Sequence, residues 1–216
     1  MVNLYKARIL GYIEYRTPAI FHATQSLLQG VNRIQARFLK AVGISEVEAL
    51  VEFNLAPLET RRDIAMLGLI QRSVLGKGPA QFGALFEREL TCNNPDGREN
   101  RLKHSKQLKS HRVGKYLDVL AHSALGLTDV YNLLPGYIVE TLEVQEFQTR
   151  LQELLRVLAQ DGCDDWKQTF STRMCIYNHP LRRVRDWSGK RVSKKIENEP
   201  KKKLMSACDN SLRFAG

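Results

Sequence analysis

The apolar residues of this chain recur at the spacing of an α-helix, and no run alternates apolar with polar residues as a half-buried strand would. The clearest case is residues 24–42, whose predicted inward face consists of Leu27, Leu28, Val31, Ile34, Gln35, Phe38, Leu39 and Val42. Such a helix must cover its apolar face by packing against other helices. The pattern therefore predicts an all-α fold, an irregular helical bundle.

Capping residues divide this pattern into separate helices. The predicted helical ranges are 4–15, 24–42, 45–53, 57–75, 79–86, part of 113–134, and 143–159, with a further turn or two in 164–170. The predicted N-terminal caps and starts are Thr24, Ser45 with Glu48, Pro57, Pro79 and Thr141, and the predicted C-terminal glycines are Gly43, Gly76 and Gly162. Apolar positions at helical spacing are Leu4, Tyr5, Ile9, Tyr12 and Ile13 in the first range and Phe147, Leu151, Leu154, Leu155 and Leu158 in the last long one.

The range 58–75 is predicted to be the central, buried helix, because apolar residues cover most of its circumference. Its one polar strip holds Arg61, Arg62 and Arg72, with Ala65 and Gly68 between them. Small residues beside arginines allow a phosphate to approach closely, and they equally allow tight helix packing. For Gly68 the packing interpretation is favoured.

The formal net charge of +10 is concentrated in two polar segments. Residues 98–115 hold seven Lys and Arg against one acid, and residues 182–216 hold eleven against four, which leaves the rest of the chain at −3. We therefore expect a helical bundle in 1–90, a basic loop or linker in 91–115, a helical segment packing on the bundle in 116–181, and a basic, disordered tail in 182–216.

Such basic clusters suit a polyanion, because each neutralised phosphate releases condensed counterions. On the helix 24–42, three cations share one face opposite the apolar residues, and in 103–115 a cation recurs at every third position. The candidate nucleic-acid-binding residues are Arg33, Arg37, Lys40, Arg61, Arg62, Arg72, Lys103, Lys106, Lys109, Arg112 and Lys115. Ordinary solvated surface and a solvated linker are the alternatives.

Two separated groups of residues carry a resemblance to a known family. The first group is Leu4-Tyr5-Lys6, Ile9-Leu10, Tyr12, Glu14-Tyr15, Pro18, Phe21-His22, Leu28, Ile34-Gln35, Phe38-Leu39, Gly43, Ala56-Pro57-Leu58 and Arg61-Arg62. The second is Val130-Tyr131-Asn132-Leu133-Leu134-Pro135, then Val139, Phe147 and Leu151. Together they resemble the region just after the palm in reverse transcriptases of non-LTR (LINE-type) retrotransposons, with Tyr131 in place of the usual tryptophan of a W-N-x-L-P ending. The resemblance covers about residues 2–158.

The resemblance implies a thumb and post-thumb region, a set of helices that grips a primer–template duplex through its backbone. It does not supply a polymerase site, which needs paired aspartates holding two Mg²⁺ ions. The family's signature is an aromatic residue, one further residue, then Asp-Asp, whereas the one Asp-Asp pair here, Asp164-Asp165, follows Gly162-Cys163 and precedes Trp166. A position at the start of a helix is the better interpretation of this pair.

No other catalytic motif is present, and we expect no enzyme activity, no cofactor, no metal and no small-molecule substrate. A zinc site from Cys163, Cys175, His179 and Cys208 is disfavoured, because their spacing matches no standard ligand set. Cys92 completes the four cysteines, which contain no CxxC pair and are expected to be reduced thiols of an intracellular protein. No apolar run is long enough to span a membrane.

The tail carries two basic clusters spaced as in a bipartite nuclear import signal, which favours a nuclear over a cytoplasmic location. The clusters are Lys190 with Arg191 and, after nine intervening residues, Lys201, Lys202 and Lys203. The expected function is a non-catalytic fragment or remnant of an RNA-directed DNA polymerase that binds the backbone of RNA, DNA or an RNA–DNA hybrid. A palm-containing polymerase chain is a possible partner. The alternatives are a helical scaffold that docks acidic proteins, and a relic with no retained function.

Overall fold

The computed structural model describes residues 1–89, 104–110, 123–172, 174, 178–182 and 184. Within these residues the regular elements are helices, with a single isolated bridge pairing Arg88 with Leu108, so the predicted all-α class is confirmed. The helices belong to one compact unit, Met1–Arg183. The four-part division predicted from the sequence stays a prediction, and the tail beyond Val184 lies outside the described residues.

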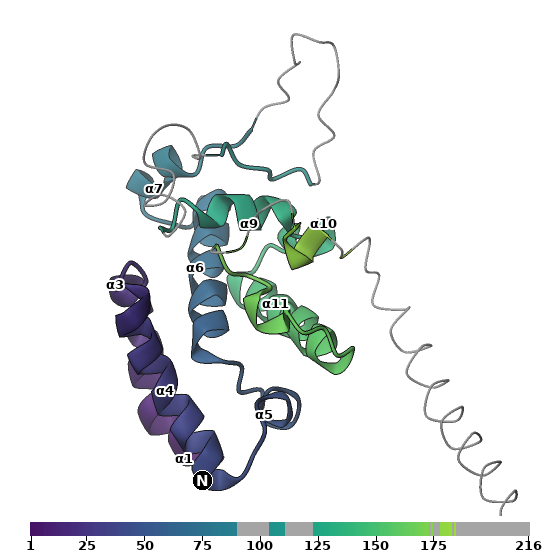
Figure 1. Cartoon of the computed structure of the whole chain (residues 1–216). Coiled ribbons are helices and arrows are strands. Elements are labelled where there is room, and N and C mark those ends of the chain that lie inside the picture. The colour runs from purple at the N-terminus through teal and green to yellow at the C-terminus, as the bar shows by residue number, and fades with distance from the viewer. Residues whose placement is uncertain (90–103, 111–122, 173, 175–177, 183, 185–216) are drawn as a thin grey trace, which may run out of the picture. The chain divides into compact units, whose positions relative to one another are not determined.

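The chain begins with a helical hairpin (Figure 1). Its first arm runs through α1 (Val2–Tyr5), the π-helical turn η1 (Lys6–Leu10) and α2 (Gly11–Tyr15), and α3 (Thr17–Ile20) forms the corner. Its second arm is α4 (Gln25–Val42). We call residues 2–42 the N-terminal hairpin.

The π turn decides which side of the first arm is buried. A π-helix closes its hydrogen bonds from i to i+5, so Leu10 instead of Ile9 follows Tyr5 on the buried side. Tyr5 and Leu10 are 3% and 4% exposed, whereas Ile9 is 42% exposed. Ile13 continues the buried side, and Tyr5 stacks on Phe38 of α4 at 4.2 Å between ring centroids.

In α4 the predicted boundaries are confirmed, with Thr24 at the N-cap position and Gly43 in the left-handed conformation at φ 73°. The predicted inward face is only partly buried. Leu28, Gln35 and Leu39 face the core, but Leu27 is 67% and Ile34 44% exposed. The prediction for these two residues is wrong, because the arms of the hairpin pack over a narrower stripe than the apolar pattern covers.

The next two helices follow the predicted local signals. The capping box at α5 (Glu46–Phe53) is confirmed, since Ser45 Oγ accepts from the Glu48 amide and Glu48 Oε2 accepts from the Ser45 amide. α6 (Leu58–Val74) begins directly after Pro57 and is followed by Gly76 at φ 71°. One apolar cluster joins Tyr5, Leu10, Ile13 and Leu39 of the hairpin to Ala49, Leu55 and Leu58.

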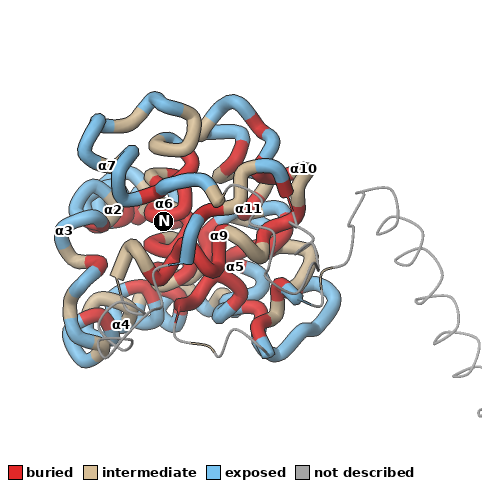
Figure 2. The backbone as a smooth tube through the Cα atoms, turned by 90° about the horizontal axis from the view of Figure 1, so that it is seen from above, coloured by how far each residue is buried: buried red, intermediate tan, exposed pale blue. Residues whose placement is uncertain are grey.

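α6 is the central helix, as predicted. It contacts α2, α3 and α4 on one side. On others it contacts α7 (Ala80–Leu85), α9 (Leu127–Leu133), α11 (Val144–Gln160) and the 3₁₀ turn η2 (Trp166–Gln168). Figure 2 shows buried stretches concentrated around α6. Gly68 lies where α6 meets α11 (Val144–Gln160): a Cβ built on Gly68 would stand 2.3 Å from Nε2 of Gln148. This close approach confirms the packing interpretation of Gly68.

The remaining helices complete the second half of the core. α7 (Ala80–Leu85) follows Pro79 as predicted, and α9 (Leu127–Leu133) ends before Pro135, where α10 (Gly136–Val139) begins. The N-cap of α11 is Glu143, so the prediction of Thr141 as its cap is wrong; the Thr141 hydroxyl donates instead to the Ile138 carbonyl at 2.6 Å. The inward set of α11 is buried except for Leu158, which is half-buried.

One buried amide ties α6 to this second half. Gln71 is fully buried, and its Nε2 donates to the carbonyls of Val139 and Thr141 at 3.0 and 2.8 Å. Its Oε1 accepts from the Tyr131 hydroxyl at 2.6 Å. Every hydrogen-bonding atom of this side chain is therefore used, which favours one arrangement of α6, α9 and α10.

Two short 3₁₀ turns end the described chain. η2 (Trp166–Gln168) buries Trp166 and is tied to α6 by a hydrogen bond from the Thr60 hydroxyl to the Lys167 carbonyl at 3.1 Å. η4 (Pro180–Arg182) follows His179, which is 1% exposed. The ring nitrogens of His179 lie 3.2 Å from the Ser171 carbonyl and 3.4 Å from the Leu181 amide, which is the environment of a packed histidine.

Candidate nucleic-acid interface

The outer face of α4 carries three exposed cations. Arg33, Arg37 and Lys40 occupy positions i, i+4 and i+7, opposite the buried face, and we call them the basic ridge. None of the three forms an ion pair with any described residue. Their exposed position opposite the buried face agrees with the sequence, and their role in nucleic-acid binding stays a prediction.

The arginines of α6 are arranged differently from the predicted strip. Arg62 is only 4% exposed, and its Nη2 donates to Oδ1 of Asn32 on α4 at 2.8 Å. Arg61 forms an ion pair with Glu14 of α2. Arg72 is exposed, and its Nε donates to the Lys77 carbonyl at 3.1 Å. Two of the three thus hold α6 to the hairpin, and Arg72 alone faces solvent.

The described part of the internal basic segment, residues 104–110, is anchored to the helical body. Leu108 is fully buried, its amide donates to Asn132 Oδ1 at 2.8 Å, and its carbonyl accepts from Asn132 Nδ2 at 2.7 Å. Lys106 Nζ donates to the Val139 carbonyl at 2.9 Å, and Lys109 pairs with Glu87 at 2.7 Å. Burial, with Arg88 nearby, lowers the pKa of Lys106. Both lysines therefore interact with other residues of the same chain.

Several predicted residues lie outside the described part of the chain. They are Lys103, Arg112 and Lys115 of the internal segment, the import-signal residues 190, 191 and 201–203, and Cys92, Cys175 and Cys208.

The N-terminal hairpin and the rest of the helical body have formal charges of opposite sign. Residues 1–42 carry six Lys and Arg and one acid, Glu14, a formal charge of +5, whereas residues 43–97 and 116–181 together carry −8. The candidate set missed two hairpin cations: Arg8 and Arg16 are exposed and form no ion pair with a described residue. Their signal in the sequence is an Arg-x₃-Tyr-x₃-Arg spacing, which places them on successive turns of one helix side.

A groove of about 370 Å³, lined by both apolar and polar side chains, lies between α4 and the start of α6. Arg33 belongs both to its lining and to the basic ridge, and Gln29 and Asn32 lie on the same helix. Across from them, Lys167 pairs with Glu46, and the Glu59 carboxylate also lines the groove. The groove is lined by both cations and carboxylates. The basic ridge holds cations alone, so it is the better surface for binding an anion.

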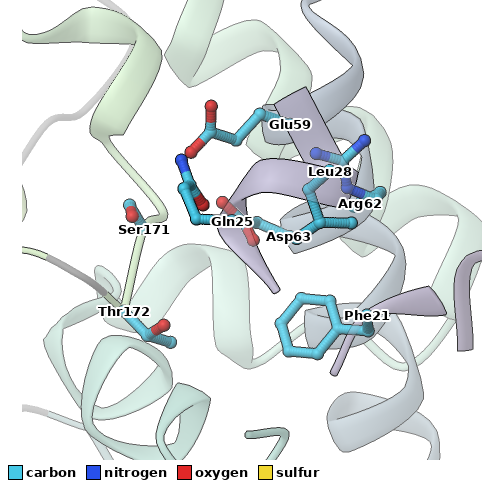
Figure 3. Close-up of a pocket in the computed structure, with 8 residues that line it drawn as sticks. All are labelled: Phe21, Gln25, Leu28, Glu59, Arg62, Asp63, Ser171 and Thr172. Carbon is cyan, nitrogen blue, oxygen red and sulfur yellow. The ribbon is translucent and has the colours of Figure 1, made fainter. Parts of the chain in front are cut away.

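A second, smaller cavity of about 20 Å³ lies between α4, α6 and the segment at Ser171 and Thr172, with Phe21 beside it (Figure 3). Its lining residues are Phe21, Gln25, Leu28, Glu59, Arg62, Asp63, Ser171 and Thr172. A space of this size holds about one water molecule. It is therefore a packing gap of the fold, too small for a nucleotide or a metabolite.

The carboxylates of the described chain form no metal centre. No group of three His, Cys, Asp or Glu side chains in this part is placed to hold a metal ion. Asp164 and Asp165 are exposed, and Asp165 occupies the N-cap of η2, the helix-start position that the sequence predicted. Cys163, beside them, is an exposed free thiol.

Within the described residues, no helix combines the length and apolar character that crossing a membrane requires. Comparisons of the chain with protein-family models, curated proteins and solved structures find no match. The resemblance to LINE-type reverse transcriptases therefore rests on the sequence motifs.

Proposed function

We propose that this chain is a non-catalytic helical module, derived from the thumb and post-thumb region of a LINE-type reverse transcriptase, that binds nucleic-acid backbone without sequence specificity. The observation that carries the proposal is the unpaired state of the basic ridge. Elsewhere in the described chain, Arg61, Lys77, Lys109, Arg150 and Lys167 each pair with a carboxylate.

Phosphate contacts made by exposed cations position a protein on nucleic acid and read no sequence. The ridge residues lie on successive turns of a helix 18 residues long, so their charges are spread along one line. A line of cations matches a phosphate backbone better than it matches a single small anion. The ridge is therefore the part of the described surface that best supports a backbone-binding role.

The test is a titration of the full chain with RNA, DNA and hybrid duplexes of several sequences, measured by fluorescence anisotropy at salt concentrations from about 50 to about 200 mM. Replacing Arg33, Arg37 and Lys40 with glutamine should flatten the slope of log affinity against log salt by about 2–3. Affinities for different sequences should stay alike.

The matched control replaces Lys77, Lys109 and Arg150 with glutamine. This triple variant removes the same number of positive charges, but each of these residues is ion-paired within the chain. We expect its salt slope to stay close to that of the unaltered chain. Equal slopes for the two triple variants, or no binding at low salt, would contradict the proposal.

A second candidate function is suggested by the exposure of Leu27 and Ile34. It is a helical module that docks an acidic protein, and a palm-containing polymerase chain is one such partner. The exposed apolar side chains of Leu27 and Ile34 lie on the same helix as the ridge, a combination that also suits a protein interface. Changing both to asparagine should leave nucleic-acid affinity unaltered if the backbone-binding proposal holds. Binding of an acidic protein that is lost in the asparagine variant, by a chain that has no affinity for nucleic acid, would instead support an apolar docking face.

A further inference from the structure

The short helix α2 presents two tyrosines to solvent. Tyr12 and Tyr15 are 61% and 87% exposed, and they lie three residues apart on one helix side. Arg8 precedes Tyr12 by about one turn, and Arg16 follows it by one turn; both arginines are exposed. We call Arg8, Tyr12, Tyr15 and Arg16 the aromatic strip.

Neither tyrosine ring of this strip is needed to fill the core. The buried side of the first arm consists of Val2, Tyr5, Leu10 and Ile13, and Thr17 continues it into α3. An aromatic side chain usually contributes by burying its large surface, so two adjacent exposed rings call for another explanation. Figure 2 shows α2 and α3 at the margin of the helical body.

The strip also has a defined local geometry. The guanidinium carbon of Arg16 lies 3.9 Å from the centroid of the Tyr12 ring, a cation–π contact that restrains both side chains. Residues three apart on an α-helix are separated by about 4.5 Å along the axis. Two side chains at this spacing are neighbours on one side of the helix.

From this geometry we propose that the aromatic strip binds unpaired bases, which stack on Tyr12 and Tyr15 while Arg8 and Arg16 contact the flanking phosphates. The inference rests on the proposed function and deepens it, because it names the preferred ligand as single-stranded RNA or DNA. Stacking needs an exposed base face, and the bases of a duplex already stack on one another. The ridge serves any backbone, whereas the strip discriminates between single strands and duplexes.

The charge of the hairpin selects this ligand over an acidic protein surface. Aromatic residues interleaved with cations are the means by which proteins hold single strands without reading their sequence. Tyrosine and arginine also occur at protein interfaces. The hairpin, however, carries +5 and its single acid is paired with Arg61, a balance suited to a polyphosphate chain.

The experiment compares three full-length proteins: the unaltered chain, Tyr12→Ala with Tyr15→Ala, and Tyr12→Phe with Tyr15→Phe. The probes are a fluorescent oligo-uridine or oligo-thymidine strand and a duplex of equal length, at one fixed salt concentration. Stacking contributes about 5- to 150-fold in affinity per base. We expect the alanine pair to lose about 10-fold or more for the single strand and less than about 2-fold for the duplex.

The phenylalanine pair keeps both rings and should bind like the unaltered chain. In addition, a strand containing 2-aminopurine should be quenched by the unaltered chain and the phenylalanine pair, but much less by the alanine pair. Both side chains are exposed, so the thermal unfolding midpoint should be the same for all three proteins. This last measurement separates a binding effect from a folding effect.

The outcomes distinguish this inference from the proposed function. If the unaltered chain binds neither probe, the proposed function fails and the inference fails with it. If it binds both probes and the alanine pair loses single-strand and duplex affinity equally, or loses none, only the stacking role is overturned. A selective loss with the alanine pair, retained by the phenylalanine pair, supports the inference.

Discussion

α4 and α11 are helices of nearly equal length, 18 and 17 residues, yet they use their surfaces in opposite ways. α11 buries Phe147, Leu151, Leu154, Leu155 and Ala159, whereas α4 buries only Leu28, Gln35 and Leu39. α11 has a formal charge of zero and α4 of +3. α11 therefore packs into the core, whereas α4 leaves apolar and cationic side chains exposed to solvent.

The cations of the two helices show the same difference. On α11, Arg150 pairs with Glu146 and also donates to the Tyr137 carbonyl, and Arg156 donates to Oδ1 of Asn54 at 3.3 Å. The cations of α4 have no such partners among the described residues. Helix composition alone therefore does not mark a binding surface; the state of the surrounding carboxylates and carbonyls does. Three pairs of substitutions compare the N-terminal hairpin with the rest of the helical body.

The largest effect is expected from removing leucine side chains in the two helices. Leu155→Ala empties a fully buried site on α11 and should lower the free energy of unfolding by about 2–5 kcal/mol. Leu27→Ala on α4 removes a side chain that is 67% exposed, and its effect should stay within about 0.5 kcal/mol. Urea unfolding with an unchanged m-value is the measurement. Similar costs at the two sites would show that the exposed face of α4 is covered in solution.

A medium effect is expected at two buried tyrosines. Tyr131→Phe leaves Gln71 Oε1 without its donor and should cost about 1–3 kcal/mol. Tyr5→Phe in the N-terminal hairpin keeps the ring stack on Phe38 and removes a hydroxyl that has no hydrogen-bond partner in the described structure. Its change in unfolding free energy should be within about 0.5 kcal/mol of zero.

The pH dependence provides a control for this pair. Burial raises the pKa of Tyr131, so the unfolded chain releases the phenolic proton at a lower pH than the folded chain. The stability from this residue is complete below about pH 10 and is lost as the pH rises above it. Unfolding measured from about pH 9 to about pH 11 should therefore show a shallower decline for Tyr131→Phe than for the unaltered chain. An identical decline would mean that Tyr131 does not remain protonated in the folded protein.

Local signals in the sequence were sufficient for much of the fold. The Ser45–Glu48 capping box and the glycines at 43, 76 and 162 depend on neighbouring backbone atoms, so their effect is readable from a few adjacent residues. The burial of α6 could also be predicted, because apolar residues of the helix itself cover most of its circumference. The π turn could not be predicted from the sequence. Its hydrogen bonds span one more residue than those of an α-helix, so Leu10 is buried in place of Ile9, and nothing in the composition indicates this.

For the candidate site, the sequence predicted the basic ridge but not which other cations are engaged. The burial of Arg62 depends on Asn32, 30 residues away, and the pairing of Lys109 depends on Glu87 across a bridge of the backbone. These are consequences of tertiary contact, which residue spacing along one helix does not report.

The smallest expected effect concerns two glycines in helix interiors. A Cβ on Gly30 of α4 would meet no atom within 4 Å, so Gly30→Ala should stabilise the protein by about 0.5–1 kcal/mol through helix propensity alone. On α6, Gly68→Ala places its Cβ 2.3 Å from Nε2 and 2.9 Å from Cδ of Gln148, so this side chain has to move and no gain is expected.

Repeating Gly68→Ala in a Gln148→Ala background isolates that contact. With the long side chain removed, the alanine should recover a stabilisation of about 0.5–1 kcal/mol, equal to that at Gly30. Thermal unfolding of the four proteins in this double-mutant cycle is the measurement. If Gly68→Ala is equally neutral in both backgrounds, Gln148 does not fill the space above Gly68. The close contact of α6 with α11 at Gly68 would then be absent in solution. The contrast between this packed site and the exposed face of α4 would be lost with it.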